Sequence, residues 1–162
     1  MNKIGFIGTG LMGLPMAKNL LKSGFNIKAY NRSISKAEPL KELGAEVSKT
    51  LSEVVKDNDF IITMLTDDVA IDAIMSNSDF LDNLKSNSTV IDMSSIKPTT
   101  AKKYGDILKL KKINYLDAPV SGGTIGAEEA SLDIMVGGDQ SVFDNSLNIL
   151  KAMGNPTLVG PI

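Results

Sequence analysis

The sequence predicts an α/β fold, with a doubly wound, mainly parallel sheet and helices on both of its faces. Short apolar runs alternate with amphipathic helical stretches along the whole chain, which is the pattern of repeated βαβ units. The run 60–65 is almost continuously apolar, as expected of a strand that is covered on both faces. No internal repeat or linker interrupts the pattern, so we expect residues 1–162 to form one domain.

The first half of the chain follows this alternation closely. Its expected elements are a strand over 3–7, a helix over 11–23, a strand over 27–30, a helix from Ser33 or Ser35 to Leu43, a strand over 46–48, a helix over 51–56 and a strand over 60–65. Gly24 and Gly44 are suited to end the helices that precede them. Pro39 predicts that its helix starts late or is kinked.

The second half continues the alternation. Its expected elements are a helix that begins at the Thr66–Asp68 caps and ends near 75, a strand over 88–93, a helix from Pro98 to about 110, a strand over 113–120, a loop over 122–129 with one helical turn, a strand over 132–136, a helix from the cap Asp139 to about 153 and a strand over 157–159. Proline suits the first turn of a helix, where its missing N–H has no helical partner.

The composition excludes several classes of function. The 162 residues carry a net charge of −2, so no basic field attracts nucleic acid or an anionic membrane. We expect a cytoplasmic protein, because no apolar run is long enough to span a bilayer and the start is too short for a signal peptide. The chain has no cysteine and no histidine, so thiolate nucleophiles, Ser-His-Asp triads and His-ligated zinc are excluded and we predict no metal site. Any general acid or base must be Asp, Glu, Lys or Tyr.

A glycine-rich loop lies between the first expected strand and the first expected helix. Its sequence, Gly8-Thr9-Gly10-Leu11-Met12-Gly13, fits the G-x-G-x-x-G pattern of a Rossmann-type dinucleotide-binding domain. In that pattern the first glycine allows the tight turn, the second leaves space for a pyrophosphate, and the third lets the helix pack closely on the strand. The N–H groups and dipole at the helix N-terminus then attract the phosphates.

The end of the second strand indicates which nicotinamide nucleotide binds. An acidic residue there would bind the ribose 2′-hydroxyl of NAD, but this chain has Asn31-Arg32-Ser33. Asn31 does not repel a 2′-phosphate, and Arg32, which is the only arginine of the chain, offers donors that match one. The prediction is therefore NADP(H), with NAD(H) as the second choice. The same residues argue against a methyltransferase, which would normally have an acidic residue at this place.

The stretch Asp117–Gly123 is a second glycine motif that follows a strand. The Ser121 hydroxyl and the backbone N–H groups of Gly122 and Gly123 could hold a carboxylate or a phosphate. Taken alone, the stretch is equally compatible with a glycine-rich turn.

The chain resembles the N-terminal domain of the β-hydroxyacid dehydrogenase family, which includes 3-hydroxyisobutyrate, tartronate-semialdehyde and 6-phosphogluconate dehydrogenases. The matching stretches are Gly8–Leu20, Thr63–Asp67, Asp92–Ser95 with Pro98, and Asp117–Gly123 continuing through Gly126-Ala127 to Met135–Gly138. The last stretch looks most like the hydroxyisobutyrate and glyoxylate/succinic-semialdehyde reductase branches. Asn31-Arg32 resembles the NADPH-using members of those branches.

The resemblance implies roles for individual residues. The implied cofactor-binding residues are Gly8, Thr9, Gly10, Leu11, Met12, Gly13, Asn31, Arg32, Ser33, Met64, Leu65 and Ser95. Ser121, Gly122 and Gly123 would hold the carboxylate of a small substrate. Two positions depart from the family pattern, because Ala130 stands where many members have glycine and Lys97 where many have a short polar or acidic residue. We assign Lys97 no role.

The resemblance also implies that catalysis needs more than these residues. The catalytic lysine of the family lies beyond the stretch that 158–162 resembles, at the start of an all-helical domain that also forms the dimer. We therefore expect no catalytic residue within 1–162, poor or no catalysis by this chain alone, and a homo-oligomeric parent enzyme. Two alternatives remain open: a non-catalytic dinucleotide-binding sensor or scaffold, and an enzyme similar to the imine reductases.

Overall fold

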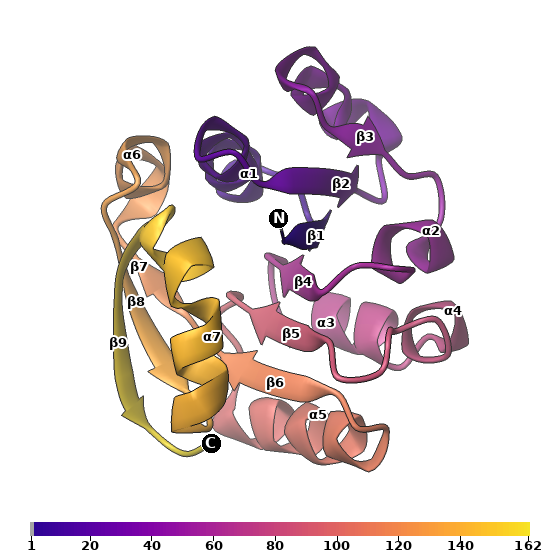
Figure 1. Cartoon of the computed structure of the whole chain (residues 1–162), viewed down its shortest axis with the longest axis vertical. Helices are drawn as coiled ribbons and strands as arrows, with labels where there is room; N and C mark the ends of the chain where they lie inside the picture. Colours follow the sequence, from indigo (N-terminus) through magenta and orange to yellow (C-terminus); the bar gives the residue numbers. More distant parts are fainter. Residues whose placement is uncertain (1) are drawn as a thin grey trace.

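The computed structural model describes residues 2–162, which form one mixed sheet of nine strands (Figure 1). The strands are β1 Lys3–Ile7, β2 Asn26–Tyr30, β3 Glu46–Val47, β4 Phe60–Thr63, β5 Thr89–Asp92, β6 Asn114–Asp117, β7 Val120–Ser121, β8 Leu132–Gly137 and β9 Gly154–Gly160. The order β3-β2-β1-β4-β5-β6 is parallel throughout and is that of a doubly wound Rossmann-type fold. The predicted fold class is confirmed.

Helices cover both faces of this sheet. They are α1 Gly13–Lys22, the 3₁₀-helices η1 Ile34–Lys36 and η2 Glu38–Leu43, α2 Leu51–Val55, α3 Asp68–Met75, α4 Ser78–Leu81, α5 Pro98–Leu110, α6 Gly123–Glu129 and α7 Gln140–Lys151. Figure 1 shows α1, α6 and α7 on one face and α2 to α5 on the other. Two apolar clusters correspond to these layers: Met16 and Ile149 belong to the first, and Ile71 and Tyr104 to the second.

The position of β4 inside the sheet, between β1 and β5, explains why its sequence is so apolar. Ile62 belongs to the cluster under α1 and α7, whereas its neighbour Ile61 belongs to the cluster under α3 and α5. All four residues of β4 are buried, so the prediction of a strand covered on both faces holds. Over residues 2–162, no helix is both long enough and apolar enough to cross a membrane.

The carboxyl ends of the parallel strands meet at one edge of the sheet. Their last residues form a row of register partners across five strands: Tyr30, Ile7, Thr63, Asp92 and Asp117. The helix after β1 lies on one face and the helix after β4 on the other, so the strand order reverses between these two strands. In open α/β sheets, ligands bind outside the carboxyl ends at such a reversal.

Several predicted elements differ from the structure. The helix expected up to Leu43 consists of η1 and η2, because Pro39 lies at the start of η2 and cannot continue an α-helix through its own position. The strand expected over 113–120 stops at Asp117, since Pro119 has no N–H for a sheet ladder, and resumes as β7. The loop expected over 122–129 contains the seven-residue helix α6, the last strand extends from Gly154 to Gly160, and α4 was not predicted.

The last strands make the sheet mixed rather than wholly parallel. Strand β8 runs antiparallel to β6, where Asp117 faces Gly137, and antiparallel to β7. Strand β9 then pairs parallel to β8, and α7 connects the two.

Candidate functional site

The glycine loop is tight at both ends and open in its middle. Gly8 has a φ of +102°, and a Cβ atom built there would lie 2.1 Å from the Met64 carbonyl oxygen. A Cβ atom on Gly13, the first residue of α1, would lie 1.8 Å from the Gly8 carbonyl oxygen. A Cβ atom on Gly10 would meet nothing within 4 Å. The outer glycines are therefore required by the chain itself, whereas the space at Gly10 is free for a ligand.

The N-terminus of α1 has free hydrogen-bond donors. Among the hydrogen bonds of residues 2–162, none uses the backbone N–H of Gly10, Leu11 or Met12. The helix has ten residues, no side-chain cap and no acidic residue in its first turn. Such a helix start attracts an anion, because its N–H groups and its dipole both favour negative charge.

Asn31 ties the end of β2 to the glycine loop. Its Oδ1 accepts a hydrogen bond from the Thr9 N–H at 3.0 Å, and its Nδ2 donates to the Ser33 carbonyl at 3.0 Å. The Gly8 N–H donates to the Tyr30 carbonyl at 2.9 Å, which adds a backbone link between the same two segments. The side chain expected to select the nucleotide thus also fixes the shape of the loop.

A cavity of about 320 Å³ opens between the glycine loop, the end of β2 and the start of α3. Its lining residues are Ile7, Gly8, Gly10, Tyr30, Asn31, Arg32, Ser33, Lys36, Met64, Leu65, Thr66, Ala70, Ala73 and Ile74. This lining contains two cations, Arg32 and Lys36, and no acidic residue. Apolar side chains of α3 and the β4–α3 loop form its opposite wall, which suits the flat face of a base.

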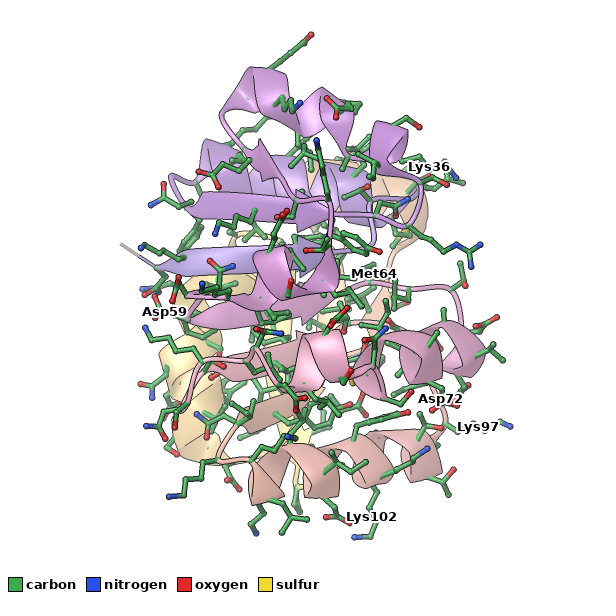
Figure 2. The ribbon with its side chains drawn as sticks, turned by 90° about the vertical axis from the view of Figure 1, so that its right-hand side faces the viewer. Lys36, Asp59, Met64, Asp72, Lys97 and Lys102 are labelled. Carbon is green, nitrogen blue, oxygen red and sulfur yellow. The ribbon has the colours of Figure 1, made fainter. Side chains whose placement is uncertain are left out.

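Lys36 is a residue that the sequence analysis missed. It lies on η1, four residues after Arg32, and is exposed beside the same cavity. Figure 2 shows Lys36, Met64 and Lys97 toward one edge of the sheet, whereas Asp59, just before β4, lies at the opposite edge. The signal in the sequence that could have identified Lys36 is its positive charge, four residues after Arg32.

A second, larger groove of about 670 Å³ shares Gly10 and Lys36 with the cavity. It runs along α1, and its lining includes the exposed Leu11 and, from α6, Thr124 and Glu128. Helix α6 is held against α1 partly by the Asn19 side chain, whose Nδ2 donates to the Ala127 carbonyl at 2.7 Å. The glycine loop therefore borders a hollow on each side.

The residues predicted to hold the substrate lie on the surface. Ser121 ends β7, and Gly122 and Gly123 lead into α6 with φ values of +139° and +62°. All three are exposed, and none lines the nucleotide cavity or the α1 groove. Of the predicted cofactor residues, those that line the nucleotide cavity are Gly8, Gly10, Asn31, Arg32, Ser33, Met64 and Leu65. Thr9 and Leu11 line the α1 groove instead, and Met12, Gly13 and Ser95 line neither hollow.

The turn after β5 divides its two serines between the interior and the surface. Ser95, which the resemblance implies for cofactor binding, is exposed and does not line the cavity. Its neighbour Ser94 is fully buried, and its Oγ accepts the Leu65 N–H at 2.8 Å. Lys97 is exposed at the start of α5, where its backbone N–H donates to the Asp68 carboxylate at 3.0 Å.

The fold and the glycine loop together define a dinucleotide-binding domain. Residues 3–160 match the family described as the NAD binding domain of 6-phosphogluconate dehydrogenase. The chain belongs to this family, the N-terminal domain of the β-hydroxyacid dehydrogenases, as its motifs indicated.

Individual relatives agree with this assignment. The chain is 40% identical over 161 residues to the 2-hydroxy-3-oxopropionate reductase of Escherichia coli, which corresponds to 98% of this chain and 54% of that protein. The structure of Mycobacterium tuberculosis 3-hydroxyisobutyrate dehydrogenase with L-serine matches with a TM-score of 0.95 and 31% identity, over 99% of this chain and 55% of that one. An imine reductase from Myxococcus stipitatus in complex with NADP⁺ matches with a TM-score of 0.91 and 25% identity, over 99% and 55%. The chain spans about half the length of the curated relatives it matches.

Proposed function

We propose that this chain is the NADP(H)-binding part of an oxidoreductase that transfers hydride between nicotinamide and a small β-hydroxyacid or semialdehyde. The observation that carries the proposal is the charge of the cavity at the end of β2. Arg32 and Lys36 are both exposed there, Ser33 adds a hydroxyl group, and no acidic residue lines the cavity. Two cations without a carboxylate favour a ribose that carries a 2′-phosphate.

The residues of the loop fit the remaining parts of the nucleotide. The open space at Gly10 and the free N–H groups before α1 suit the pyrophosphate, and the apolar wall of Leu65, Ala70 and Ile74 suits the adenine. The nucleotide, once bound, supplies the hydride chemistry. The protein's part is to bind and orient it at the carboxyl ends of β1 and β4.

The substrate and the second half of the site are part of the same proposal. Ser121, Gly122 and Gly123 would hold the substrate carboxylate, as the family resemblance implies. The general acid or base would be a lysine outside residues 1–162, on a helical domain that also forms a homo-oligomer. Residues 1–162 alone would then bind nucleotide with little or no turnover. An enzyme-like rate of NADPH oxidation by this purified chain with a small semialdehyde would contradict that part.

Parallel calorimetric titrations with NADPH and NADH test the choice of nucleotide. The wild type should prefer NADPH, and Arg32→Ala should weaken NADPH binding at least tenfold, since a charged hydrogen bond contributes about 1.5–3 kcal/mol. NADH binding should change little. Lys102→Ala is the matched control, because it removes an exposed cation on α5, far from Lys36 (Figure 2). Equal losses for both nucleotides in Arg32→Ala would contradict the NADP(H) assignment.

A further inference from the structure

A buried polar cluster lies beside the nucleotide cavity, at the carboxyl ends of β4 and β5. Thr63 and Asp92 are register partners at the ends of these strands, and Ser94 follows in the next turn. All three residues are completely buried. None of them lines the cavity, and the sequence analysis gave none of them a role. Because burying polar groups is costly, their hydrogen bonds should reveal what they hold in place.

The Asp92 carboxylate is the centre of this cluster. Its Oδ1 accepts hydrogen bonds from the Thr63 hydroxyl at 2.9 Å and from the Ser94 N–H at 3.0 Å. The Ser94 hydroxyl oxygen in turn accepts the Leu65 N–H at 2.8 Å. A continuous chain of hydrogen bonds therefore runs from Asp92 through Ser94 to the loop between β4 and α3.

That loop forms the far wall of the nucleotide cavity. The Met64 carbonyl occupies the space that a side chain on Gly8 would need, and Leu65 and Thr66 line the cavity. The Met64 N–H continues the sheet ladder to Ile7 at 2.9 Å, but Leu65 is past the end of the strand. Ser94 is therefore the group that holds the Leu65 backbone after the sheet has ended.

We infer that Asp92 is a positioning residue of the nucleotide site, whose carboxylate acts through Thr63 and Ser94 to hold the Met64–Leu65 segment against the glycine loop. This inference rests on the proposed function, because it assumes that the cavity binds a nucleotide. A wall that is held in its bound position before the ligand arrives costs less to order on binding.

The ionisation of Asp92 should affect how firmly it holds the segment. Its Oδ2, the Asp117 Oδ1 and the Tyr115 hydroxyl are all buried without a hydrogen-bond partner in the described structure. Burial raises the pKa of Asp92 to about 6, the hydrogen bonds from Ser94 and Thr63 oppose this rise, and the charge of Asp117 adds to it. Burial also raises the pKa of Asp117 to about 6. An ionised oxygen accepts stronger hydrogen bonds than a neutral one, so the segment should loosen as Asp92 takes up a proton.

Other charged groups on this face are engaged elsewhere. The titratable groups on the elements packed around Asp92 are Tyr115 and Asp117 of β6, Asp68 and Asp72 of α3, Lys97 at the N-cap of α5, and Lys102, Lys103, Tyr104, Asp106 and Lys109 of α5. Asp68 accepts the Lys97 N–H, and the Tyr104 hydroxyl donates to Asp72. Lys103 lies 3.6 Å from Asp72. Of this set, only Asp117 contributes charge to the environment that sets the Asp92 pKa.

A pair of serine variants tests the link to the loop. Ser94→Ala removes the acceptor of the Leu65 N–H, and calorimetry at pH 8 should show NADP⁺ binding weakened by about 3- to 10-fold, the equivalent of one hydrogen bond. Ser146→Ala is the matched control, because this serine is also fully buried and makes one hydrogen bond, at 2.8 Å to the Val142 carbonyl within α7. Its binding should stay within about twofold of the wild type. Equal affinity of Ser94→Ala and the wild type would overturn the inference.

The pH profile separates positioning from a general loss of stability. The NADP⁺ affinity of the wild type should fall as pH drops from 8 to 5, and it should fall more steeply than that of Asp92→Asn. Protonation of the 2′-phosphate of the ligand affects both proteins equally, because both are titrated with NADP⁺. Asp117→Asn should keep the wild-type affinity at pH 8 and move the fall to lower pH. Parallel profiles for the wild type and Asp92→Asn would contradict the role of the carboxylate.

A readout without nucleotide keeps the inference separate from the proposed function. Hydrogen exchange of the Leu65 amide should be at least tenfold faster in Ser94→Ala than in Ser146→Ala. If the wild type bound neither NADP⁺ nor NAD⁺, the proposed function would fail, and with it the inference as stated for binding. If the wild type bound nucleotide but the Leu65 amide exchanged equally in both variants, only the inference would fail.

Discussion

The three glycines of the loop have different physical reasons to be glycine, although one motif contains them all. Gly8 and Gly13 are required by contacts within the chain, because a Cβ atom at either would overlap a carbonyl oxygen. Gly10 has open space around it. Stability and ligand binding therefore depend on different positions of the same motif.

Substitutions of two of these glycines should separate stability from binding. Gly13→Ala should lower the free energy of unfolding by about 2–3 kcal/mol, since the new methyl group forces α1 away from the loop. Gly10→Ala should change stability by less than about 0.5 kcal/mol but weaken NADP⁺ binding at least tenfold. Urea unfolding and calorimetry on both variants test this. Unchanged affinity in Gly10→Ala would mean that the pyrophosphate does not approach this residue.

The raised pKa of Asp92 also predicts how stability depends on pH. The folded chain binds the proton of this group more tightly than the unfolded chain, so the group lowers stability as pH rises from about 4 to about 6 and keeps it lower above that. Asp92→Asn has no such group. The unfolding free energy of Asp92→Asn, relative to that of the wild type, should therefore increase by up to about 3 kcal/mol between pH 4 and pH 8. This is the free-energy equivalent of raising the pKa from 3.8 to about 6.

Urea unfolding of both proteins at several pH values measures this difference. Curves that stay parallel from pH 4 to pH 8 would show that the Asp92 pKa is not raised in the folded chain. A gain in stability together with weaker nucleotide binding in Asp92→Asn would mean that the carboxylate is retained for the site at a cost to the fold.

At the residue scale, the motifs were easier to predict from the sequence than the residues that support them. The glycine loop and Arg32 were predicted because the residues that indicate their chemistry are adjacent in the sequence. The Asn31–Thr9 hydrogen bond joins residues 22 positions apart, and the Ser94–Leu65 bond joins residues 29 apart. Both depend on strand register, which a single sequence does not state. Asp92 was identified only as part of a stretch that resembles the family, because no adjacent residue indicates that its carboxylate is buried.

At the scale of elements, the errors were at proline and at the connections. Pro39 was expected to delay or kink its helix, and in the structure two short 3₁₀-helices replace that helix. Pro119 was read as part of a strand, although it separates β6 from β7. Alternation of apolar residues identified the long elements correctly. It could not show that β8 turns antiparallel to β6, because strand direction depends on how α6 and β7 connect them.

The end of α6 offers a test at this scale. Ala130 adopts a left-handed conformation with a φ of +55° directly after the helix, where glycine is the favoured residue. Ala130→Gly should therefore raise the free energy of unfolding by about 1 kcal/mol. Ala127→Gly, in the helical part of α6 and fully buried, is the control and should lower it. Urea unfolding of both variants measures the two changes, and a loss of stability in Ala130→Gly would contradict the argument.

At the scale of the whole molecule, the described residues form one compact unit. Their accessible surface is 7985 Å², close to the roughly 7,800 Å² expected of a folded monomer of this mass. The two apolar clusters lie on opposite faces of a shared sheet, and β4 contributes side chains to both. The layers therefore cannot unfold independently without exposing the strands between them. The doubly wound arrangement was predictable because each helix must cover an apolar sheet face before the chain can return to the next strand.

Under the proposed NADP(H) function, the contact between Asn31 and Thr9 restricts which residues can replace Asn31. Its side-chain oxygen holds the Thr9 N–H, so a replacement must place an acceptor at the same distance from the backbone. Among the amino acids, only aspartate does so with the same side-chain shape, although it gives up the donation to the Ser33 carbonyl. Its negative charge favours a ribose hydroxyl over a ribose phosphate. Asparagine and aspartate codons differ by one base. A single base change would therefore shift the proposed NADP(H) site toward NAD(H), whereas most other replacements of Asn31 would leave the Thr9 N–H without its acceptor.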